Sequence, residues 1–584
     1  MRKYYIGLSV TYHDPALAII DQQGVVLYAE ATERILQNKR ALNCPPDALF
    51  DIEAILRRYC VSPDVIDIAI NWKKNRPFYE NVVAALGCLS AQGLDKQGLK
   101  RLRSPLENYK LHHMMACQRN SIAAAGLNLV RIIREIYPLC QLTFADFDHH
   151  LTHAATACYG SPFSEAACAV VDSFGENGSL AFYRYQQGEL HRLYESRGTG
   201  SLGLFYMKIT ELCGFDWIKG EEWKVMGLAP YGKFNAEFYR LLAEIIEING
   251  FACRHRGRNI FSHLDALEKF KVSTEGDEAQ AADLAYTGQY FFSELMTKLL
   301  QHLQQRFRCE NLVLTGGCAL NSSFNGQIIK KTAFEQVHVP SAPADDGTAL
   351  GAAWLSLRKN RPDLEIKPKL LSPYTGSEIT SRALQRFIDF NRSFNIQNLA
   401  GQIYQTTAAL LADGQLIGWI QGRAEFGPRA LGNRSILADP RPAQSKDKIN
   451  QRVKFRESFR PFAPAVLHEY AGEYFENYQL SPYMDKTQSI KPAQRQKIAA
   501  VCHVDGTGRV QTVKQEWNPR FYELIRQFNQ LTEIPILLNT SFNVMGKPLV
   551  HSLEDAIAVL MTTGLDAIVI DETLISKNRR HDYS

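Results

Sequence analysis

The sequence predicts an α/β protein with two large domains, the first of which is internally duplicated. A strand–turn–strand pattern at residues 4–20 precedes a helical block at about 50–137, and a second strand–turn–strand follows at 179–196. Recurrence of one supersecondary unit indicates duplication. A stretch rich in Pro, Lys and Ser then separates this half from a second alternation of strands and helices. Such a stretch is typical of a linker between domains.

The elements follow from local patterns. The first hairpin closes at the turn His13-Asp14-Pro15, and short buried strands are expected at Leu142–Asp146 and Ala166–Asp172. A helix is expected at Asp283–Arg308, with a strand at Asn311–Thr315 ending in the turn Gly316-Gly317. Three strands (415–421, 534–541 and 565–571) and a helix (554–564) are expected in the second half. We therefore predict a first domain at 1–360, a linker at 361–376 and a second domain at 377–584.

Composition excludes several classes of protein. The 66 basic and 61 acidic residues leave a net charge of +5 on 584 residues, so nucleic-acid binding is not expected. None of the 12 cysteines forms a C-x-x-C pair, which argues against a zinc ribbon or a thiol redox motif. No apolar run approaches the ~20 residues that span a membrane. The start Met1-Arg2-Lys3 leads into a strand and not into a signal peptide, so we expect a cytoplasmic protein.

Two histidines and nearby carboxylates form a candidate metal site. His149 and His153 are four residues apart at the start of a predicted helix and so lie on one face. Asp172 ends a strand, and Asp345 and Asp346 occupy a turn before a helix of small residues. Two histidines with one or two carboxylates and open positions suit Fe²⁺ better than structural zinc. The histidines taken alone fit a hydrogen-bonded helix start equally well.

Long motifs run in one order through almost the whole chain: IGLSVTYHDPALAIID, DHHLTHAATACY, KVMGLAPYG, TGGCALN, PADDGTALGAA, GRAEFGPRALGNRSILADPR, NQRVKFRESFRPFAP, VDGTGRVQTV and NTSFN. With these motifs the sequence resembles the O-carbamoyltransferases of antibiotic tailoring and nodulation-factor decoration. The resemblance implies a duplicated actin-like, sugar-kinase-like first domain, similar to the tRNA threonylcarbamoyl-transfer protein. It implies a second α/β domain that resembles the threonylcarbamoyl-adenylate synthase fold.

The resemblance also implies a reaction and its ligands. Carbamoyl phosphate and ATP, which carries Mg²⁺, would form carbamoyl-adenylate in the second domain. A hydroxyl of a small-molecule natural product would then attack the carbamoyl group in the first domain, releasing AMP. The implied metal is Fe²⁺ or another divalent ion, and its implied ligands are His149, His153, Asp172 and Asp345. No membrane partner is implied, and a homodimer is allowed for.

Cations in the second-domain motifs are suited to phosphate. The motifs contain Arg423, Arg429, Arg434, Lys454, Arg456, Arg460 and Arg509. Guanidinium groups match phosphate oxygens in pairs, and an ammonium adds a point charge. We expect four of them to touch substrate, namely Arg429, Lys454, Arg460 and Arg509, because Arg429 and Arg460 lie in rigid proline-containing contexts. The resemblance adds Ser541 to this site.

The first domain offers a second nucleotide site and a base. A helix predicted after Gly316-Gly317 would present free N–H groups to phosphate, although a GG pair alone indicates only a turn. Within the family pattern these glycines become nucleotide contacts, together with Asn321, Lys224 and Gly227. His13 is the residue that the family uses as its proposed base, and imidazoles titrate near pH ~6.5. The segment 72–111, with Trp72, Phe78 and Tyr79, is expected to shape the acceptor pocket.

Three other functions compete with this interpretation. A hydrogenase-maturation carbamoyltransferase would need an acylphosphatase-like domain and paired C-x-x-C motifs, which this sequence lacks. A tRNA threonylcarbamoyl-type enzyme would not need the second domain. An actin-like ATPase or scaffold would show no dependence on carbamoyl phosphate. No sequence motif identifies the acceptor.

Overall fold

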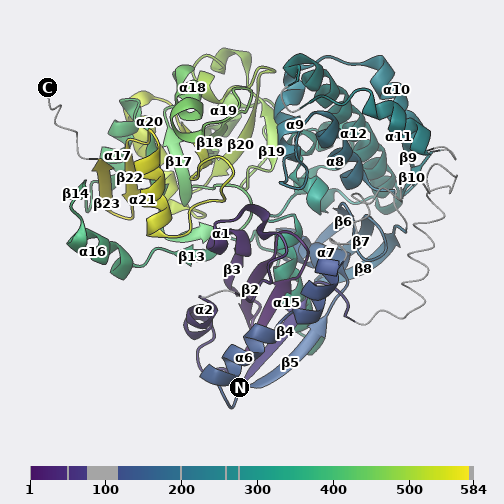
Figure 1. Cartoon of the computed structure of the whole chain (residues 1–584), viewed down its shortest axis with the longest axis horizontal. Coiled ribbons are helices and arrows are strands. Elements are labelled where there is room, and N and C mark those ends of the chain that lie inside the picture. Colours follow the sequence, from purple (N-terminus) through teal and green to yellow (C-terminus); the bar gives the residue numbers. More distant parts are fainter. Residues whose placement is uncertain are drawn as a thin grey trace. The chain divides into compact units, whose positions relative to one another are not determined.

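A computed structural model describes residues 2–48, 51–74, 116–197, 200–256, 260–273 and 276–577 (Figure 1). The chain divides into two compact units. Unit 1 comprises Met1–Glu33, Arg40–Asn321 and Gln327–Leu371, and unit 2 comprises Arg34–Lys39, Ser322–Gly326 and Ser372–Ser584. The main division, after Leu371, falls inside the predicted linker. The functions assigned to the two domains remain predictions.

The first sheet of unit 1 has the order β3-β2-β1-β4-β5. Its strands are β1 (Lys3–Ser9), β2 (Ala16–Asp21), β3 (Val26–Ala31), β4 (Val65–Ile70) and β5 (Gln141–Asp146). Strands β1 to β3 are antiparallel neighbours, whereas β4 runs parallel to both β1 and β5. Ile6 faces Ile19 of β2 on one side and Ile68 of β4 on the other, and all three are buried.

The second sheet of unit 1 repeats this plan with the order β8-β7-β6-β11-β12. Its strands are β6 (Glu165–Val171), β7 (Leu180–Gln186), β8 (Glu189–Glu195), β11 (Asn311–Thr315) and β12 (Gln336–His338). Again three antiparallel strands adjoin two parallel ones. The identical order and direction confirm the predicted internal duplication and the α/β class.

Two helices of small residues lie between the halves of unit 1 and position the site. Helix α7 (His149–Tyr159) and helix α15 (Thr348–Asn360) are both largely buried. A Cβ atom on Gly351 would lie 1.9 Å from the carbonyl oxygen of Thr152, and one on Gly7 would lie 1.8 Å from that of Ala349. Only glycine therefore permits α15 to approach α7 and β1 this closely.

The remaining helices of unit 1 follow amphipathic or apolar patterns. They are α2 (Ile52–Tyr59), α6 (Leu127–Ile136), α8 (Leu202–Leu212), α9 (Glu222–Leu228), α10 (Ala236–Ile245), α11 (Ile260–Glu268), α12 (Glu278–Phe307) and α14 (Ile328–Lys331), with a hairpin of β9 (Ile246–Asn249) and β10 (Ala252–His255). Helix α1 (Thr32–Leu36) begins with two residues of unit 1 and continues with three of unit 2. Helix α12 begins five residues before the predicted start because Asp277 caps it by accepting a hydrogen bond from the Ala279 N–H.

Unit 2 contains a nine-stranded sheet in the order β14-β23-β22-β15-β17-β21-β18-β20-β19. The strands are β14 (Phe394–Asn398), β15 (Ile417–Ile420), β17 (Arg434–Ala438), β18 (Ala463–Leu467), β19 (Lys486–Ser489), β20 (Thr507–Val513), β21 (Ile536–Ser541), β22 (Ala567–Ile570) and β23 (Thr573–Lys577). A separate pair joins β13 (Tyr374–Glu378) to β16 (Arg423–Glu425), so regular structure begins inside the predicted linker. The helices are α13 (Ser322–Asn325), α16 (Ser381–Phe390), α17 (Ile403–Ala412), α18 (Gln444–Ile449), α19 (His468–Tyr474), α20 (Pro519–Thr532) and α21 (Leu553–Thr562).

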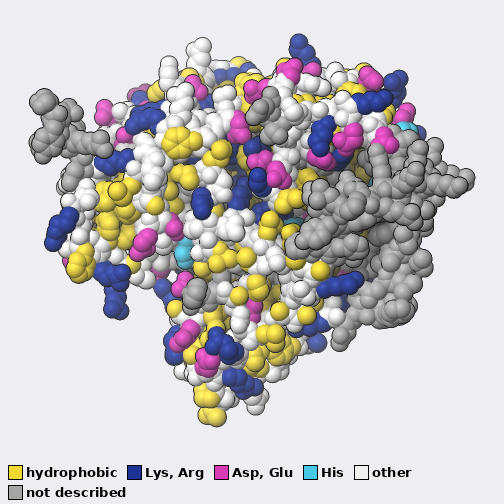
Figure 2. Space-filling model, in the orientation of Figure 1, with side chains coloured by type: hydrophobic (Ala, Val, Ile, Leu, Met, Phe, Trp, Pro, Cys, Tyr) yellow, Lys and Arg dark blue, Asp and Glu magenta, His cyan; other side chains and the backbone are white. Residues whose placement is uncertain are grey.

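Two surface properties bear on possible partners. Figure 2 shows Lys and Arg interspersed with Asp and Glu among the described residues of the face in view, as the nearly balanced composition predicts. Within the described ranges, every helix is too short or too polar to cross a lipid bilayer.

Candidate metal centre and phosphate site

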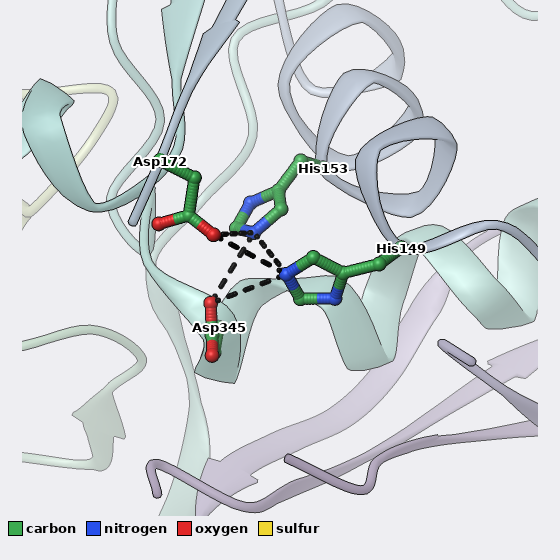
Figure 3. A group of neighbouring side chains, drawn as sticks. All are labelled: His149, His153, Asp172 and Asp345. Atoms are coloured by element: carbon green, nitrogen blue, oxygen red, sulfur yellow. Dashed lines mark hydrogen bonds and ion pairs between the residues drawn. The ribbon is translucent and has the colours of Figure 1, made fainter. Parts of the chain in front are cut away.

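Helix α7 presents both candidate histidines from its first two turns. Asp148 caps the helix, accepting a hydrogen bond from the Leu151 N–H at 3.0 Å. The carboxylate of Glu176 accepts a second one from the N–H of His149 at 2.8 Å. Two carboxylates therefore satisfy N–H groups that the first turn of a helix leaves without partners. The spacing of His149 and His153 then directs both imidazoles to the same side (Figure 3).

Four buried side chains converge at that point. His149, His153, Asp172 and Asp345 are 0–6% exposed, and their four ligand atoms all lie within 4.8 Å of one another. The Nε2 atoms of His149 and His153 are 3.2 Å apart. The carboxylate oxygens of Asp172 and Asp345 lie 3.3–3.8 Å from these nitrogens. Thus α7, the end of β6 and the turn before α15 each contribute to one cluster.

The spacing of the cluster fits a divalent transition metal. Around an ion with bonds of about 2.0–2.2 Å, tetrahedral ligands lie roughly 3.4 Å apart. The distances between histidine nitrogens and the other ligand atoms, 3.2–3.8 Å, lie close to that value. Two imidazoles and two carboxylates suit Fe²⁺ and also Zn²⁺. The residues therefore fit the predicted metal, whereas iron as its identity remains a prediction.

Electrostatics also favour a cation at this point. Burial lowers the pKa of His149, but its contacts with Asp172 and Asp345 outweigh burial and raise that pKa well above the ordinary value. Burial raises the pKa of Asp345, but contacts with both histidines outweigh it and hold that pKa well below the ordinary value. The two carboxylates therefore favour positive charge between them, which a bound metal ion would supply.

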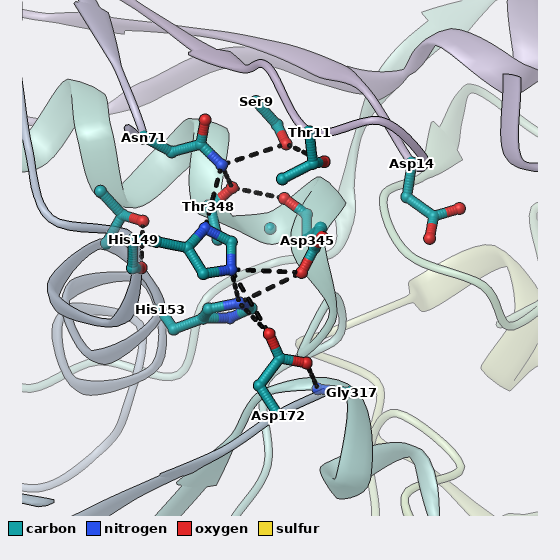
Figure 4. Close-up of polar contacts among 12 residues, drawn as sticks. Ser9, Thr11, Asp14, Asn71, His149, His153, Asp172, Gly317, Asp345 and Thr348 are labelled. Atoms are coloured by element: carbon teal, nitrogen blue, oxygen red, sulfur yellow. Dashed lines mark hydrogen bonds and ion pairs between the residues drawn. The ribbon is translucent and has the colours of Figure 1, made fainter. Parts of the chain in front are cut away.

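Further residues hold the ligands in place (Figure 4). The N–H of Gly317 donates to the carboxylate of Asp172 at 3.0 Å. The amide of Asn71 donates to the Thr348 hydroxyl at 2.7 Å and lies 3.4 Å from Nδ1 of His149. The indole ring of Trp72 stacks on the His149 imidazole with centroids 4.8 Å apart. Such outer contacts orient metal ligands, and sequence patterns did not identify Asn71 or this role of Trp72.

His150 faces away from the cluster, as its position on the helix predicts. Burial and the neighbouring His149 lower its pKa to about 4, so the ring is neutral at physiological pH. Its Nε2 has no hydrogen-bond partner among the described residues. This histidine is a packed core residue.

The structure corrects the predicted helix after Gly316-Gly317. A 3₁₀ turn occupies Gly317–Leu320, and the helix that follows, Ser322–Asn325, has only four residues. The N–H of Gly316 donates to the carbonyl of Pro343 at 2.9 Å, and that of Gly317 donates to Asp172. The N–H groups of the two glycines are thus already bonded, and the role of this turn in nucleotide binding remains a prediction. Gly316 adopts φ +90°, which ends the strand in a turn instead of leading into a helix.

The other predicted nucleotide contacts lie elsewhere in unit 1. Asn321 exchanges hydrogen bonds with Gln289 at 2.9 and 3.2 Å. Lys224 pairs with Glu221 at 2.8 Å, and Gly227 is buried in α9. Their role in nucleotide binding remains a prediction.

The predicted base lies next to the metal cluster. Nδ1 of His13 is 3.6 Å from a carboxylate oxygen of Asp345 and 2.9 Å from one of Asp14. Burial raises the pKa of Asp14, but Arg40 and His13 outweigh burial and lower it. Asp14 is therefore ionised beside the imidazole. The turn between β1 and β2 thus brings His13 to the metal ligands.

Unit 2 gathers several of the motif cations at close range. Burial and Arg509 lower the pKa of Arg429 well below its ordinary value. Burial, Arg456 and Arg460 do the same for Lys454. Burial lowers the pKa of Arg509 to about 10. The lowering of one cation's pKa by another requires positive charges at close range. We call Arg429, Lys454, Arg456, Arg460 and Arg509 the cation cluster.

Arg456 belongs to the cation cluster more clearly than the sequence suggests. Burial, Arg460 and Arg509 lower its pKa well below the ordinary value, and Glu457 offsets this only in part. Its guanidinium lies 4.6 Å from the Phe462 ring centroid. One of its terminal nitrogens is buried with no hydrogen-bond partner in the described part of the chain. That nitrogen is available to an anionic ligand.

Two other arginines of the motifs donate hydrogen bonds to backbone carbonyls of unit 2. Arg434 is fully buried and donates to the carbonyls of Gly422 and Ser377, each at 3.1 Å. Arg423 donates to the carbonyls of Gly376 and Thr375. Both guanidinium groups therefore tie loops of unit 2 together.

Lys454 is engaged with the NTSFN motif. It ends a π-helical turn at Asn450–Lys454 and is buried. Its ammonium donates to the carbonyl and hydroxyl of Ser541 and to the carbonyl and side chain of Asn543. A lysine so surrounded shapes the 541–543 loop and places Ser541 beside the cation cluster, while the contact of Ser541 with substrate remains a prediction.

Comparison with known proteins now identifies the family. A family model described as the carbamoyltransferase N-terminus matches residues 4–354, and one described as the carbamoyltransferase C-terminus matches residues 408–577. The chain belongs to the carbamoyltransferase family. It is therefore an enzyme that transfers a carbamoyl group, and the resemblance noted in the sequence is confirmed.

Relatives of this carbamoyltransferase extend over most of its length. An uncharacterized protein of Synechocystis sp. is 31% identical over 98% of this chain and 97% of that protein. Nodulation protein NolO of Bradyrhizobium diazoefficiens is 35% identical over 74% of this chain and 79% of that protein. Among solved structures, T. kodakarensis HypF is similar with 11% identity and a TM-score of 0.31, over 63% of this chain and 49% of that one.

Part of the expected acceptor region cannot be placed. Of the segment 72–111, residues 75–111 lie outside the described residues, and with them Phe78 and Tyr79. Trp72 is described and packs on His149. The residues that sequence patterns missed, Asn71 and Glu176, carry no metal-ligand spacing, so only their spatial contacts with His149 identify them.

Replacement of Glu176 is expected to weaken the metal site without removing a ligand. Glu176 also accepts a hydrogen bond from the Lys73 N–H at 3.2 Å, so it links the residues after β4 to the start of α7. We expect Glu176→Ala to lower metal affinity about 10- to 100-fold. Glu176→Gln, which keeps an acceptor oxygen, should lose less. Competition titration with a chelator measures this, with exposed Glu237→Ala as the control. Equal metal affinity in Glu176→Ala and wild type would contradict the role.

Proposed function

We propose that this carbamoyltransferase acts in two steps, in which unit 2 forms carbamoyl-adenylate and unit 1 transfers the carbamoyl group to a hydroxyl of a small-molecule natural product. The substrates of unit 2 would be carbamoyl phosphate and ATP with Mg²⁺. The family supports carbamoyl transfer, and the cation cluster supports the use of two polyanionic substrates. The acceptor class rests on the resemblance of the sequence to natural-product carbamoyltransferases.

The single observation that carries the adenylate step is the concentration of positive charge in unit 2. Arg509 lowers the pKa of Arg429 and of Arg456, and Arg456 and Arg460 lower that of Lys454. Positive charges held at close range are stabilised by a bound anion. Guanidinium groups suit phosphate oxygens in particular. Two phosphorylated substrates would supply that negative charge.

The chemistry in unit 2 then has a clear electrostatic reason. Water would first cleave the O–P bond of carbamoyl phosphate, which releases inorganic phosphate and leaves carbamate. A carbamate oxygen must then approach the α-phosphorus of ATP, and the two anions repel. The arginines of the cation cluster would lower that repulsion and hold both groups in line. The Ser541 hydroxyl and Asn543 amide, positioned by Lys454, would contact the small carbamoyl group. Pyrophosphate would leave, and carbamoyl-adenylate would remain.

Unit 1 would provide the base and the metal ligands for transfer. His149, His153, Asp172 and Asp345 would hold a divalent ion, which when bound supplies Lewis acidity toward a phosphate or carbonyl oxygen. His13 lies beside this cluster and would accept the proton of the attacking hydroxyl. Asn71, Thr348 and Gly317 would keep the ligands oriented. We retain the expected cytoplasmic location as part of this proposal.

Pyrophosphate release tests the adenylate step directly. We expect the wild-type enzyme to release pyrophosphate from ATP only when carbamoyl phosphate is present. Arg460→Ala should release it about 10- to 100-fold more slowly, since a lost hydrogen bond to a charged group is worth about 1.5–3 kcal/mol. Arg434→Ala is unsuitable as a control because it is buried, so the exposed Arg382→Ala serves instead.

The same assay separates the competing functions. An actin-like ATPase or scaffold would hydrolyse ATP, if at all, without carbamoyl phosphate and would release phosphate. A tRNA threonylcarbamoyl-type enzyme would require tRNA for transfer. Absence of carbamoyl-phosphate-dependent pyrophosphate release in the wild type would overturn the adenylate mechanism, while mass spectrometry of hydroxyl-bearing metabolites would identify the acceptor by the gain of one carbamoyl group.

A further inference from the structure

Asp14 contacts the His13 imidazole, and Arg40 in turn contacts Asp14. Nδ1 of His13 lies 2.9 Å from the carboxylate oxygen Oδ2 of Asp14. The guanidinium of Arg40 donates to the same oxygen, through Nη2 at 3.3 Å and Nε at 3.4 Å. The other terminal nitrogen of Arg40 donates to the carbonyls of Trp217 and Ile218 at 3.1 and 3.2 Å. Arg40 is therefore anchored at both ends, and Asp14 is held between it and the imidazole.

The backbone reinforces this arrangement. The N–H of Asp14 donates to the carbonyl of Arg40 at 2.8 Å, and that of Asn43 donates to the carbonyl of Tyr12 at the same distance. Asp14, Arg40 and Asn43 adopt left-handed φ values of 56°, 62° and 57°. Residues other than glycine keep such conformations only where their surroundings impose them, and they gather at functional sites. The N–H of Arg40 also donates to Glu33 at 2.8 Å.

This geometry determines which nitrogen of His13 is free. A carboxylate oxygen of Asp14 lies 2.9 Å from Nδ1, and because an ionised carboxylate can only accept, Nδ1 carries the proton that Asp14 accepts. The lone pair of a neutral imidazole then lies on Nε2. A carboxylate on one ring nitrogen is the device that fixes the tautomer of a catalytic histidine. Nε2 is accordingly the atom that can take a proton.

We propose that Asp14 is a positioning residue that presents Nε2 of His13 to the acceptor hydroxyl, and that Arg40 holds Asp14 in place. This inference rests on the proposed function. In the transfer step the acceptor oxygen bonds to the carbamoyl carbon while its proton passes to Nε2. The bond from that carbon to the phosphate oxygen breaks, and its electron pair leaves with AMP. The proton on Nε2 is then released to solvent.

The experiment compares transfer kinetics of Asp14→Asn with those of the wild type in the full-length, metal-loaded chain. An amide can donate to Nδ1 and so favours the wrong tautomer. We expect kcat for transfer to fall about a hundredfold, while KM for the acceptor changes less than about threefold because the acceptor is not contacted. Pyrophosphate release should keep its wild-type rate. Asp363→Asn, which alters an exposed Asp–Arg pair, is the matched control.

A double mutant distinguishes positioning from general damage. If Asp14 acts through His13, Asp14→Asn should have little further effect in a His13→Ala background, because residues that act as a unit are not additive. Multiplied losses in the double mutant, or a wild-type kcat in Asp14→Asn, would overturn the proposal. Should Asp14→Asn fail to fold, the transfer kcat of Arg40→Lys is compared with that of Arg40→Gln. Arg40→Lys, which keeps a positive charge beside Asp14, should retain more of the wild-type kcat. Equal losses of kcat in the two variants would overturn the proposal. A wild type without pyrophosphate release or transfer would instead refute the proposed function.

Discussion

His149→Ala or His153→Ala is expected to remove the metal and to abolish carbamoyl transfer while leaving pyrophosphate release intact. Each histidine supplies one of four ligand atoms within 4.8 Å of one another, so its loss breaks the set. Lewis-acid stabilisation is worth several kcal/mol, which corresponds to a fall in transfer rate of about 10²- to 10⁴-fold. The adenylate step uses the cation cluster of unit 2 and should continue. The two half-reactions would thereby be separated.

The metal should also stabilise the wild-type protein. A ligand at 1,000 times its Kd stabilises the folded state by about 4 kcal/mol, so the melting temperature should rise when metal is added to metal-free enzyme. In His149→Ala the carboxylates of Asp172 and Asp345 each lose a histidine partner, at 3.4 and 3.6 Å, and burial then disfavours both negative charges. The metal-free variant should therefore melt below the metal-free wild type and gain little from metal.

Elemental analysis after dialysis and thermal unfolding with and without Fe²⁺ or Zn²⁺ check these expectations. His191→Ala is the matched control, because His191 is exposed on β8 and far in sequence from the ligands. Unchanged metal content in both His149→Ala and His153→Ala would contradict the assignment of these histidines as metal ligands. The ion retained by the wild type would also decide between iron and zinc.

The sequence predicts the ligand set because simple local rules apply to each member. His149 and His153 share a helix face, Asp172 ends a strand, and Asp345 precedes a helix. His149, His153 and Asp172 follow from spacing or from the end of an element, whereas the choice of Asp345 over Asp346 comes from the family resemblance. Their convergence follows from the duplicated sheets, whose strand order is the same. Duplication was itself visible as a repeated strand–turn–strand.

Residues that act through long-range contacts were not predictable in this way. Glu176 lies in a loop, and only its hydrogen bond to the His149 N–H gives it a role. Arg40 reaches Asp14 from 26 positions away through a left-handed backbone. Neither contact leaves a periodic pattern. Such pairings depend on tertiary structure, which local propensity does not encode.

One local prediction failed for a physical reason. The helix expected after Gly316-Gly317 is replaced by a 3₁₀ turn because Gly316, at φ +90°, ends the strand in a turn. The domain bounds stay a prediction, and the two compact units differ from them in placing Arg34–Lys39 and Ser322–Gly326 in unit 2.

Arg509→Met is expected to stabilise the ligand-free enzyme and to impair adenylate formation. Arg509 lies on β20, where burial lowers its pKa to about 10, and its Nε has no hydrogen-bond partner among the residues that the structure describes. Arg509 in turn lowers the pKa of Arg429 and Arg456. Methionine has a similar length but no charge, so it removes this repulsion. Stabilising substitutions commonly raise the free energy of unfolding by about 0.5–2 kcal/mol.

For a unit of this size, 1 kcal/mol raises the melting temperature by roughly 2–4 °C, so Arg509→Met should melt a few degrees above the wild type when both lack ligands. The order should reverse with ATP and carbamoyl phosphate present, because the wild type binds the phosphates through a full cation cluster.

Pyrophosphate release by Arg509→Met should fall about 10- to 100-fold, as for the loss of a charged hydrogen bond. Calorimetry with and without substrates measures both effects, and Arg382→Met, on the exposed face of α16, controls for the change of residue type. If Arg509→Met is less stable than the wild type without ligands and releases pyrophosphate normally, Arg509 serves the fold and not the substrate. A charge that binds phosphate is expected to destabilise the folded protein while no anion is bound.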